Sequence, residues 1–219
     1  MNILGIDEAG RGPVIGPMVM CGYLVEEERV HELKALGVKD SKLLSPEKRE
    51  ELFPKIKAIA RDMVVLSIPA KEIDRLRTET NLNKLEIERM RQMIMLLRPD
   101  VAKIDAPEAN TVKFHGKVAR GISNTKIVAE NFADKRHVEV GAASIIAKVH
   151  RDREISKLHG KYGFFGSGYA SDDRTIRFLK DWLQNNNDFP DIVRKSWITA
   201  ITMKSEREQK KLAQFTKAG

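Results

Sequence analysis

Acidic residues at four positions are candidates for holding a metal ion: Asp7, Glu8, Asp105 and Asp134. Asp7 closes the apolar segment NILGID, and Asp105 closes the segment VAKID in the same way. A carboxylate at the end of a buried strand is costly to desolvate unless a partner or a metal meets it. Because sites form where the strands of an α/β sheet end, we expect Asp7 and Asp105 to share one site. Oxygen ligands of this kind suit Mg²⁺ or Mn²⁺ better than zinc.

Glu8 raises a geometric question, because neighbouring residues of a strand point to opposite faces. Asp7 and Glu8 can serve one site only if the chain leaves strand geometry at Glu8. The glycines Gly10 and Gly12 make such a turn feasible. The alternative is that Glu8 begins a solvated loop.

The segment GRGPVIG, residues 10–16, is a second candidate for chemistry. It is not a phosphate-binding loop of the GxxxxGK[ST] type, because no Gly-Lys-Ser/Thr follows, and its glycine spacing departs from GxGxxG. Gly10 and Gly12 can instead bring backbone N–H and C=O groups close to a ligand, with Arg11 beside them. A plain turn is the alternative.

The elements that must position these residues follow from hydrophobic periodicity and from turn residues. Strands are predicted over residues 2–7, 18–25, 63–68, 101–105 and 125–129. Helices are predicted over 26–36, 46–60, 80–98, 138–158, 171–185 and 205–217, with Ser45 and Ser171 as caps, whereas 192–202 has no clear assignment. Three early strands, followed by two that alternate with helices, predict an α/β fold with a mixed sheet.

The 219 residues, 42% of them hydrophobic, suffice for one main domain, which we place at residues 1–190 with a helical extension at 191–219. The formal net charge of +8 favours a polyanionic partner, above all nucleic acid, although ordinary surface charge is the alternative. Cys21 is alone, which excludes a disulfide framework and a cysteine zinc site. No signal peptide or membrane span is evident, so we expect a cytoplasmic protein. We also expect a monomer.

Several spaced motifs together resemble the type 2 ribonucleases H, the ribonuclease HII family. They are GIDEAGRGPVIGP at 5–17, DSKLLSPEKRE at 40–50, KIDAP at 103–107, AASIIAKVHRDR at 142–153 and GSGYASD at 166–172. Their order extends the resemblance over about residues 1–180, and the early position of Asp7 suggests the archaeal type. Two departures are Phe132, where the family usually has the lysine of a KAD motif, and Ala170, where it tends to have proline.

The resemblance implies a ribonuclease H-like fold, with a mixed central sheet flanked by helices. It implies an endonuclease that hydrolyses the RNA strand of RNA/DNA hybrids and incises 5′ of ribonucleotides embedded in duplex DNA. Two Mg²⁺ or Mn²⁺ ions would be held by Asp7, Glu8, Asp105 and Asp134, and the products would carry 5′-phosphate and 3′-hydroxyl ends.

The same resemblance implies that Gly10, Arg11 and Gly12 read the 2′-hydroxyl of the substrate and that Tyr169 senses an RNA–DNA junction. A buried core role is the alternative for Tyr169. Lys42 and Ser144 are candidates for phosphate contacts. A solvated charge is equally consistent for Lys42, and close helix packing for Ser144.

The tail carries the spacing Q-x-x-L-x-x-F at Gln209, Leu212 and Phe215, which resembles a sliding-clamp binding peptide. Helical spacing places Leu212 and Phe215 on one face. The usual second aromatic is replaced by Thr216, which favours the alternative of an amphipathic last helix packed on the enzyme's own core.

Two other functions are consistent with part of the pattern. A resolvase or transposase with a ribonuclease H-like fold would share the carboxylates but would not need the GRG segment together with Tyr169. A basic hybrid-binding protein would not need four acidic residues, because these repel phosphate unless a metal intervenes.

Overall fold

The computed structural model describes residues 1–38 and 43–217, with side chains described as far as residue 209. Three predicted site residues therefore have side chains outside the described part: Lys42, Leu212 and Phe215. The chain divides into two compact units, which we describe separately. Unit 1 contains residues 1–9, 18–67 and 80–152, and unit 2 contains residues 10–17, 68–79 and 153–219. The predicted domain boundary after residue 190 stays a prediction.

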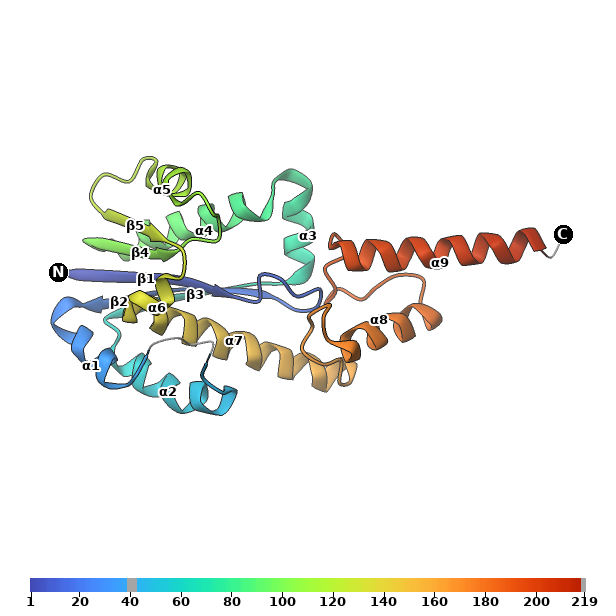
Figure 1. The fold of residues 1–219 in the computed structure, drawn as a ribbon, viewed down its shortest axis with the longest axis horizontal. Helices are drawn as coiled ribbons and strands as arrows, with labels where there is room; N and C mark the ends of the chain where they lie inside the picture. The colour runs from blue at the N-terminus through green and yellow to red at the C-terminus, as the bar shows by residue number, and fades with distance from the viewer. Residues whose placement is uncertain (39–42, 218–219) are drawn as a thin grey trace. The chain divides into compact units, whose positions relative to one another are not determined.

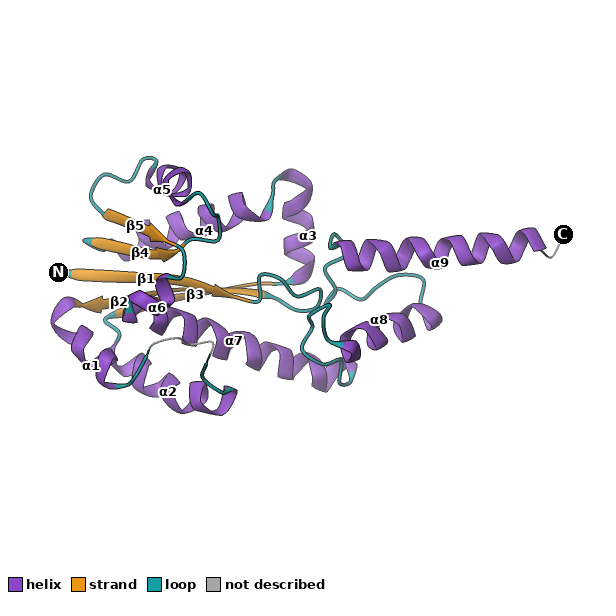
Figure 2. Cartoon of the chain, viewed as in Figure 1, coloured by secondary structure: helices purple, strands orange, loops and turns teal. Residues whose placement is uncertain are grey.

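A five-stranded sheet forms the centre of unit 1 (Figures 1 and 2), with strand order β3-β2-β1-β4-β5. Its strands are β1 (Asn2–Ala9), β2 (Met18–Glu26), β3 (Asp62–Ile68), β4 (Val101–Asp105) and β5 (Lys126–Glu130). β1 pairs antiparallel with β2 and parallel with β4, and β4 pairs parallel with β5. The predicted α/β fold with a mixed sheet is confirmed.

The helices follow in chain order after a short 3₁₀ turn at Glu27–Arg29. They are α1 (Val30–Ala35), α2 (Pro46–Ile59), α3 (Ala70–Glu79), α4 (Leu82–Leu97), α5 (Thr111–Ala119), α6 (Ala133–Arg136), α7 (Val138–Tyr162), α8 (Asp173–Asn185) and α9 (Ile198–Lys217). None of the described helices is both long and apolar enough to cross a bilayer.

Helices α1, α2 and α7 cover one face of the sheet, and α4 covers the other (Figure 1). The first face buries Ile3, Val19 and Tyr23 against Ile56 of α2 and Ile146 of α7. The close approach of α7 depends on Gly5, where an added Cβ would lie only 2.3 Å from the carbonyl carbon of Glu139. Since side chains alternate along a strand, Asp7 faces the same way as Ile3, toward α7.

Unit 2 has its own apolar core, in which the loop at residues 10–17 packs with segments far along the chain. Val14 and Ile15 are buried with Phe165, Leu179 and Phe189. An isolated bridge joins Ile15 to Val193, so the glycine-containing loop is anchored by chain that lies about 180 residues later.

Several predicted boundaries need correction. The cap of α8 is Asp172 and not Ser171, because its carboxylate accepts the backbone N–H of Arg174. The last helix begins at Ile198, which places 198–202 of the unassigned segment in α9. Helices α3 and α5 were not predicted, because each is short and dominated by charged or weakly helix-forming residues; tertiary packing of Ile73 and Phe114 stabilises them.

Candidate active site

Asp7 lies inside β1 and not at its end, because pairing with β2 continues through Ala9 opposite Val19. Glu8 is therefore still in strand geometry, opposite Met20. The turn at Glu8 that a site shared by Asp7 and Glu8 would require is therefore not made, and the alternative that Glu8 begins a loop is wrong. Glu8 is half-buried, and its backbone N–H donates to Oδ1 of Asp7 at 2.8 Å. Its part in metal binding stays a prediction.

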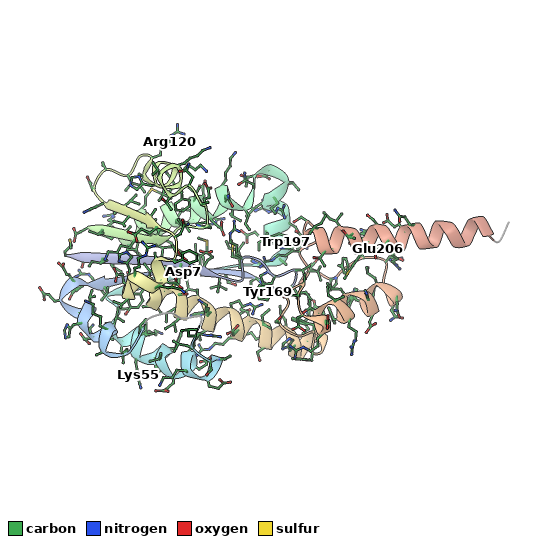
Figure 3. All side chains as sticks on the ribbon, viewed as in Figure 1. Asp7, Lys55, Arg120, Tyr169, Trp197 and Glu206 are labelled. Carbon is green, nitrogen blue, oxygen red and sulfur yellow. The ribbon has the colours of Figure 1, made fainter. Side chains whose placement is uncertain are left out.

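The carboxylate of Asp7 is buried, with 5% of the residue exposed, and it lies in the middle of the unit in Figure 3. Its pKa is raised from 3.8 to about 6, chiefly by burial and to a smaller extent by the nearby carboxylate of Asp105. The Lys148 ammonium and a hydrogen bond with Ser144 act in the opposite direction on this pKa. Asp7 is thus a desolvated acid beside another acid, with one cation close by on α7.

Asp105 reaches Asp7 through the register of the parallel strands. Ile6 on β1 pairs with Ile104 on β4, so the two aspartates follow at neighbouring positions on adjacent strands. Sequence reasoning expected this convergence, and the effect of Asp105 on the pKa of Asp7 agrees with it.

Asp134 comes to the same part of the sheet through the turn before α6. The backbone N–H of Ala133 donates to Oδ1 of Asp105 at 2.9 Å, which joins the start of α6 to the end of β4. The next residue, Asp134, is 1% exposed, and both of its carboxylate oxygens are buried. The fold therefore joins Asp7 to Asp105 and Asp105 to the helix that carries Asp134.

This donor set fits a hard divalent cation. Buried carboxylates that face one another repel, and a cation held between them offsets both the repulsion and the loss of hydration. Within the described residues, no three His, Cys, Asp or Glu side chains form a ready-made metal-binding group. The fit therefore rests on the paired Asp7 and Asp105 and on the burial of Asp134.

Ser144 and Lys148 support Asp7 from one turn of α7. Ser144 is fully buried, and the Lys148 ammonium donates to its hydroxyl. Since this hydroxyl also bonds to Asp7, Ser144 is engaged by the carboxylate. Its predicted phosphate contact stays a prediction.

In unit 2, the loop that contains Gly10, Arg11 and Gly12 is tied to the loop that carries Tyr169. The N–H groups of Val14 and Ile15 both donate to the carbonyl of Gly168, at 2.8 and 3.1 Å. Gly10 has a φ of 76°, a left-handed conformation in which glycine is the least strained residue.

Tyr169 and Gly12 lie against each other. A Cβ added at Gly12 would lie 3.7 Å from Cε1 of the Tyr169 ring. Tyr169 is 40% exposed, so the alternative of a buried core tyrosine is wrong. The exposed backbone of Gly12 and an exposed aromatic ring thus form one surface within unit 2.

Arg194 is a residue that sequence reasoning missed. It is fully buried, and its guanidinium donates to the carbonyls of Gly10, Arg11 and Gly16, the last two at 2.8 and 3.1 Å. An arginine directly after the apolar residues Ile192 and Val193 was the available signal, because a charged side chain beside core residues needs buried partners.

Trp197 completes this support (Figure 3). Its indole N–H donates to the carbonyl of Gly12 at 3.1 Å, and the guanidinium of Arg194 lies 4.8 Å from its ring centroid. Together, Arg194 and Trp197 hold the carbonyls of all three residues of the GRG segment, which orders this backbone before any ligand binds.

The sequence model of the Ribonuclease HII family matches residues 4–200. The chain belongs to the ribonuclease HII family. It is 47% identical to ribonuclease HII of Methanothrix thermoacetophila over 208 residues, which cover 94% of this chain and 98% of that protein. It is 42% identical to ribonuclease HII of Pyrococcus abyssi over 222 residues, with 99% and 98% of the two chains covered.

Solved structures agree with this membership. The ribonuclease H2 of Pyrococcus horikoshii OT3 has a TM-score of 0.86 at 42% identity, covering 94% of this chain and 98% of that one. The ribonuclease HII of Archaeoglobus fulgidus, solved as a PCNA complex, has a TM-score of 0.84 at 41% identity, with 90% and 95% covered. The ribonuclease H-like fold and the archaeal-type resemblance are confirmed.

Membership in the ribonuclease HII family determines the general reaction. The chain is an endonuclease that hydrolyses the RNA strand of RNA/DNA hybrids, and ribonucleases of this kind depend on divalent metal ions. A resolvase or transposase, and a hybrid-binding protein without activity, are therefore excluded.

Proposed function

We propose that this endonuclease also incises 5′ of ribonucleotides embedded in duplex DNA, and that two Mg²⁺ or Mn²⁺ ions support both reactions. The observation that carries the metal assignment is the buried Asp7 beside the half-buried Asp105 on the neighbouring parallel strand. Asp7, Asp105 and Asp134 would hold the ions. The family resemblance also implies Glu8, but strand geometry at Glu8 directs its side chain to the face opposite that of Asp7, so Glu8 is the ligand that this geometry supports least. When bound, such a pair lowers the pKa of an attacking water and stabilises charge on the departing 3′-oxygen, which leaves 5′-phosphate and 3′-hydroxyl ends.

The chain's own residues prepare this site. The parallel pairing of β1 with β4, in which Ile6 pairs with Ile104, supports this assignment, because Asp7 and Asp105 follow at neighbouring positions without reorganisation of the backbone. Burial of Asp7 excludes water from one side of the site. The Lys148 ammonium lowers the cost of keeping Asp7 ionised.

In this proposal, the surface formed by Gly12 and Tyr169 in unit 2 recognises the ribonucleotide. The 2′-hydroxyl is the group that distinguishes RNA from DNA, and it can both donate and accept a hydrogen bond. The backbone of residues 10–12, with Arg11 beside it, offers both kinds of partner. The exposed ring of Tyr169, adjoining Gly12, is available to pack on the neighbouring deoxyribose and so to sense the junction.

A cleavage assay with two substrates tests this proposal. One duplex carries a single ribonucleotide in otherwise DNA strands, and the other is an RNA/DNA hybrid. We expect both duplexes to be cut in Mg²⁺, with incision 5′ of the single ribonucleotide. A DNA ligase and a 5′-phosphatase test whether the ends are 5′-phosphate and 3′-hydroxyl. Asp105→Asn, which removes one charged ligand, should reduce turnover on both by at least about 100-fold. Wild-type turnover of Asp105→Asn would show that the metal assignment is wrong.

We further propose that the C-terminal tail binds a sliding clamp. The Archaeoglobus fulgidus relative was solved as a complex with PCNA, and this chain carries Gln209, Leu212 and Phe215 at clamp-peptide spacing. Gln209 is exposed on α9, which extends to Lys217.

A pull-down with an archaeal PCNA tests the tail. Phe215→Ala should lose clamp binding while cleaving a short hybrid at the wild-type rate. Phe164→Ala removes an exposed aromatic (66% exposed) from outside the tail and serves as the matched control. If Phe215→Ala still binds the clamp but melts at a lower temperature, the tail packs on the enzyme and the clamp proposal is wrong.

A further inference from the structure

Phe132, immediately before α6, has an unusual backbone conformation for its residue type. Its φ of 59° and ψ of 37° are left-handed, a region that L-residues other than Gly, Asn and Asp rarely adopt. Among the described residues, only Arg98 and Phe132 have positive φ without being glycine. Arg98 ends α4, where a left-handed residue is common, whereas Phe132 stands at the beginning of a helix.

The left-handed turn allows the backbone N–H of Ala133 to donate a hydrogen bond to Oδ1 of Asp105. Any residue that tolerates the left-handed region would make the same turn, and Gly or Asn would make it with less strain. The turn therefore explains the backbone of Phe132 but not its phenyl ring. Whatever the ring contacts within the chain, the residue is 60% exposed, so most of it is accessible to a ligand.

The place of Phe132 in the chain suggests what its ring contacts. Phe132 is two residues before the buried Asp134, and its neighbour Ala133 is bonded to Asp105. A nucleotide whose phosphate is held at these carboxylates must place its sugar within a few ångström of them. An exposed aromatic ring at the edge of such a site offers an apolar surface for a sugar or a base.

We propose that Phe132 is a substrate-binding residue, whose ring packs against the sugar of the nucleotide beside the scissile phosphate. This inference rests on the assignment of Asp105 and Asp134 to the active site. The strained backbone is retained because the ring that it carries adds affinity for the hybrid. An apolar contact of this kind also adds affinity that is insensitive to salt, unlike a lysine–phosphate contact.

The structure provides a matched set of variants. Phe132→Asn keeps a residue that tolerates the left-handed region but removes the ring, and Phe132→Tyr keeps the ring. Arg98→Asn makes the same change of backbone preference at the other left-handed position, which is also exposed and belongs to the same unit. KM and kcat on a short RNA/DNA hybrid, and the melting temperature, are measured for each.

We expect Phe132→Asn to raise KM by about 5- to 150-fold, the range of one lost stacking contact, with a much smaller change in kcat. Its melting temperature should be equal to or above that of the wild type, because strain is relieved and little burial is lost. Phe132→Tyr should restore most of the affinity. Arg98→Asn should show the same thermal behaviour with KM unchanged. In Phe132→Lys, affinity should become more salt-dependent, with a slope of log Kd against log salt steeper by about 0.7–0.9.

A wild-type KM for Phe132→Asn would overturn the inference, and so would a lower melting temperature without a change in KM. The first result would mean that the ring does not touch substrate, and the second that it is structural. The Asp105→Asn variant separates this failure from failure of the site. If Asp105→Asn cleaves normally, the metal assignment is wrong, whereas an inactive Asp105→Asn with a wild-type KM for Phe132→Asn refutes the role of Phe132 alone.

Discussion

Asp7→Asn should make the metal-free protein more stable while it removes cleavage. Burial raises the pKa of Asp7 from 3.8 to about 6, so the folded chain binds this proton more tightly than the unfolded chain does. A difference of about 2 pKa units corresponds to about 3 kcal/mol, since each unit is worth about 1.36 kcal/mol. Asparagine has nearly the same shape and carries no charge, so the variant avoids this cost.

The stabilisation should depend on pH with a defined sign. Below about pH 4, Asp7 is protonated in both folded and unfolded chains, and its ionisation costs nothing. Between pH 4 and 6 the unfolded chain releases the proton first, so the stability contributed by this group is lost as the pH rises through about 6. The advantage of Asp7→Asn should therefore grow across this window and stay constant above it. At pH 8 it should reach about 6–12 °C in melting temperature.

Thermal melts in EDTA from pH 4 to 8 measure this effect. Asp172→Asn is the control of opposite sign, because the Arg174 guanidinium holds the pKa of Asp172 well below its usual range. Asp172→Asn should therefore lower the stability above the ordinary carboxyl pKa. Added Mg²⁺ should stabilise the wild type more than Asp7→Asn. If Asp7→Asn melts at or below the wild-type temperature at pH 8 without metal, Asp7 is not a strained, desolvated carboxylate and the reasoning fails.

Two further substitutions test the surface in unit 2. Tyr169→Ala should reduce incision at a single ribonucleotide more than cleavage of a hybrid. The reason is that the ring contacts the sugar at the junction, whereas the metal chemistry is common to both substrates. Equal losses of kcat/KM on the two substrates would contradict a sensing role. Arg194→Met should destabilise the protein by about 3–5 kcal/mol in urea unfolding, because three backbone carbonyls lose a buried charged donor. Arg77→Ala is the control. It removes an exposed guanidinium that lies 4.7 Å from the same Trp197 ring, and it should lower the free energy of unfolding by less than about 1 kcal/mol. Similar losses in both variants would show that the stabilising effect of Arg194 does not come from its burial.

Local patterns in the sequence were enough to predict most of the sheet and the long helices. The strand at 101–105 and the N-cap at Ser45 are as predicted, because apolar runs and capping residues act over a few neighbours. The motifs that resemble ribonuclease HII were equally local, and the family they indicated is confirmed. The expectation that Asp7 and Asp105 converge also came from a local rule, namely that strand ends meet at one edge of a sheet.

Three features depended on tertiary structure. β1 continues past Asp7 because β2 pairs with it as far as Ala9, and pairing of this kind depends on residues that are distant in sequence. Asp105 meets the start of α6 only through the left-handed turn at Phe132, a conformation for which phenylalanine has no local preference. Arg194 supports Gly10 across 184 positions of sequence. The sequence by itself determined the strands, the long helices and the reaction class, because those depend on short-range periodicity and on motif chemistry. Only the folded chain decided which side chains meet, because burial and hydrogen bonding between distant residues exist only once the core has formed.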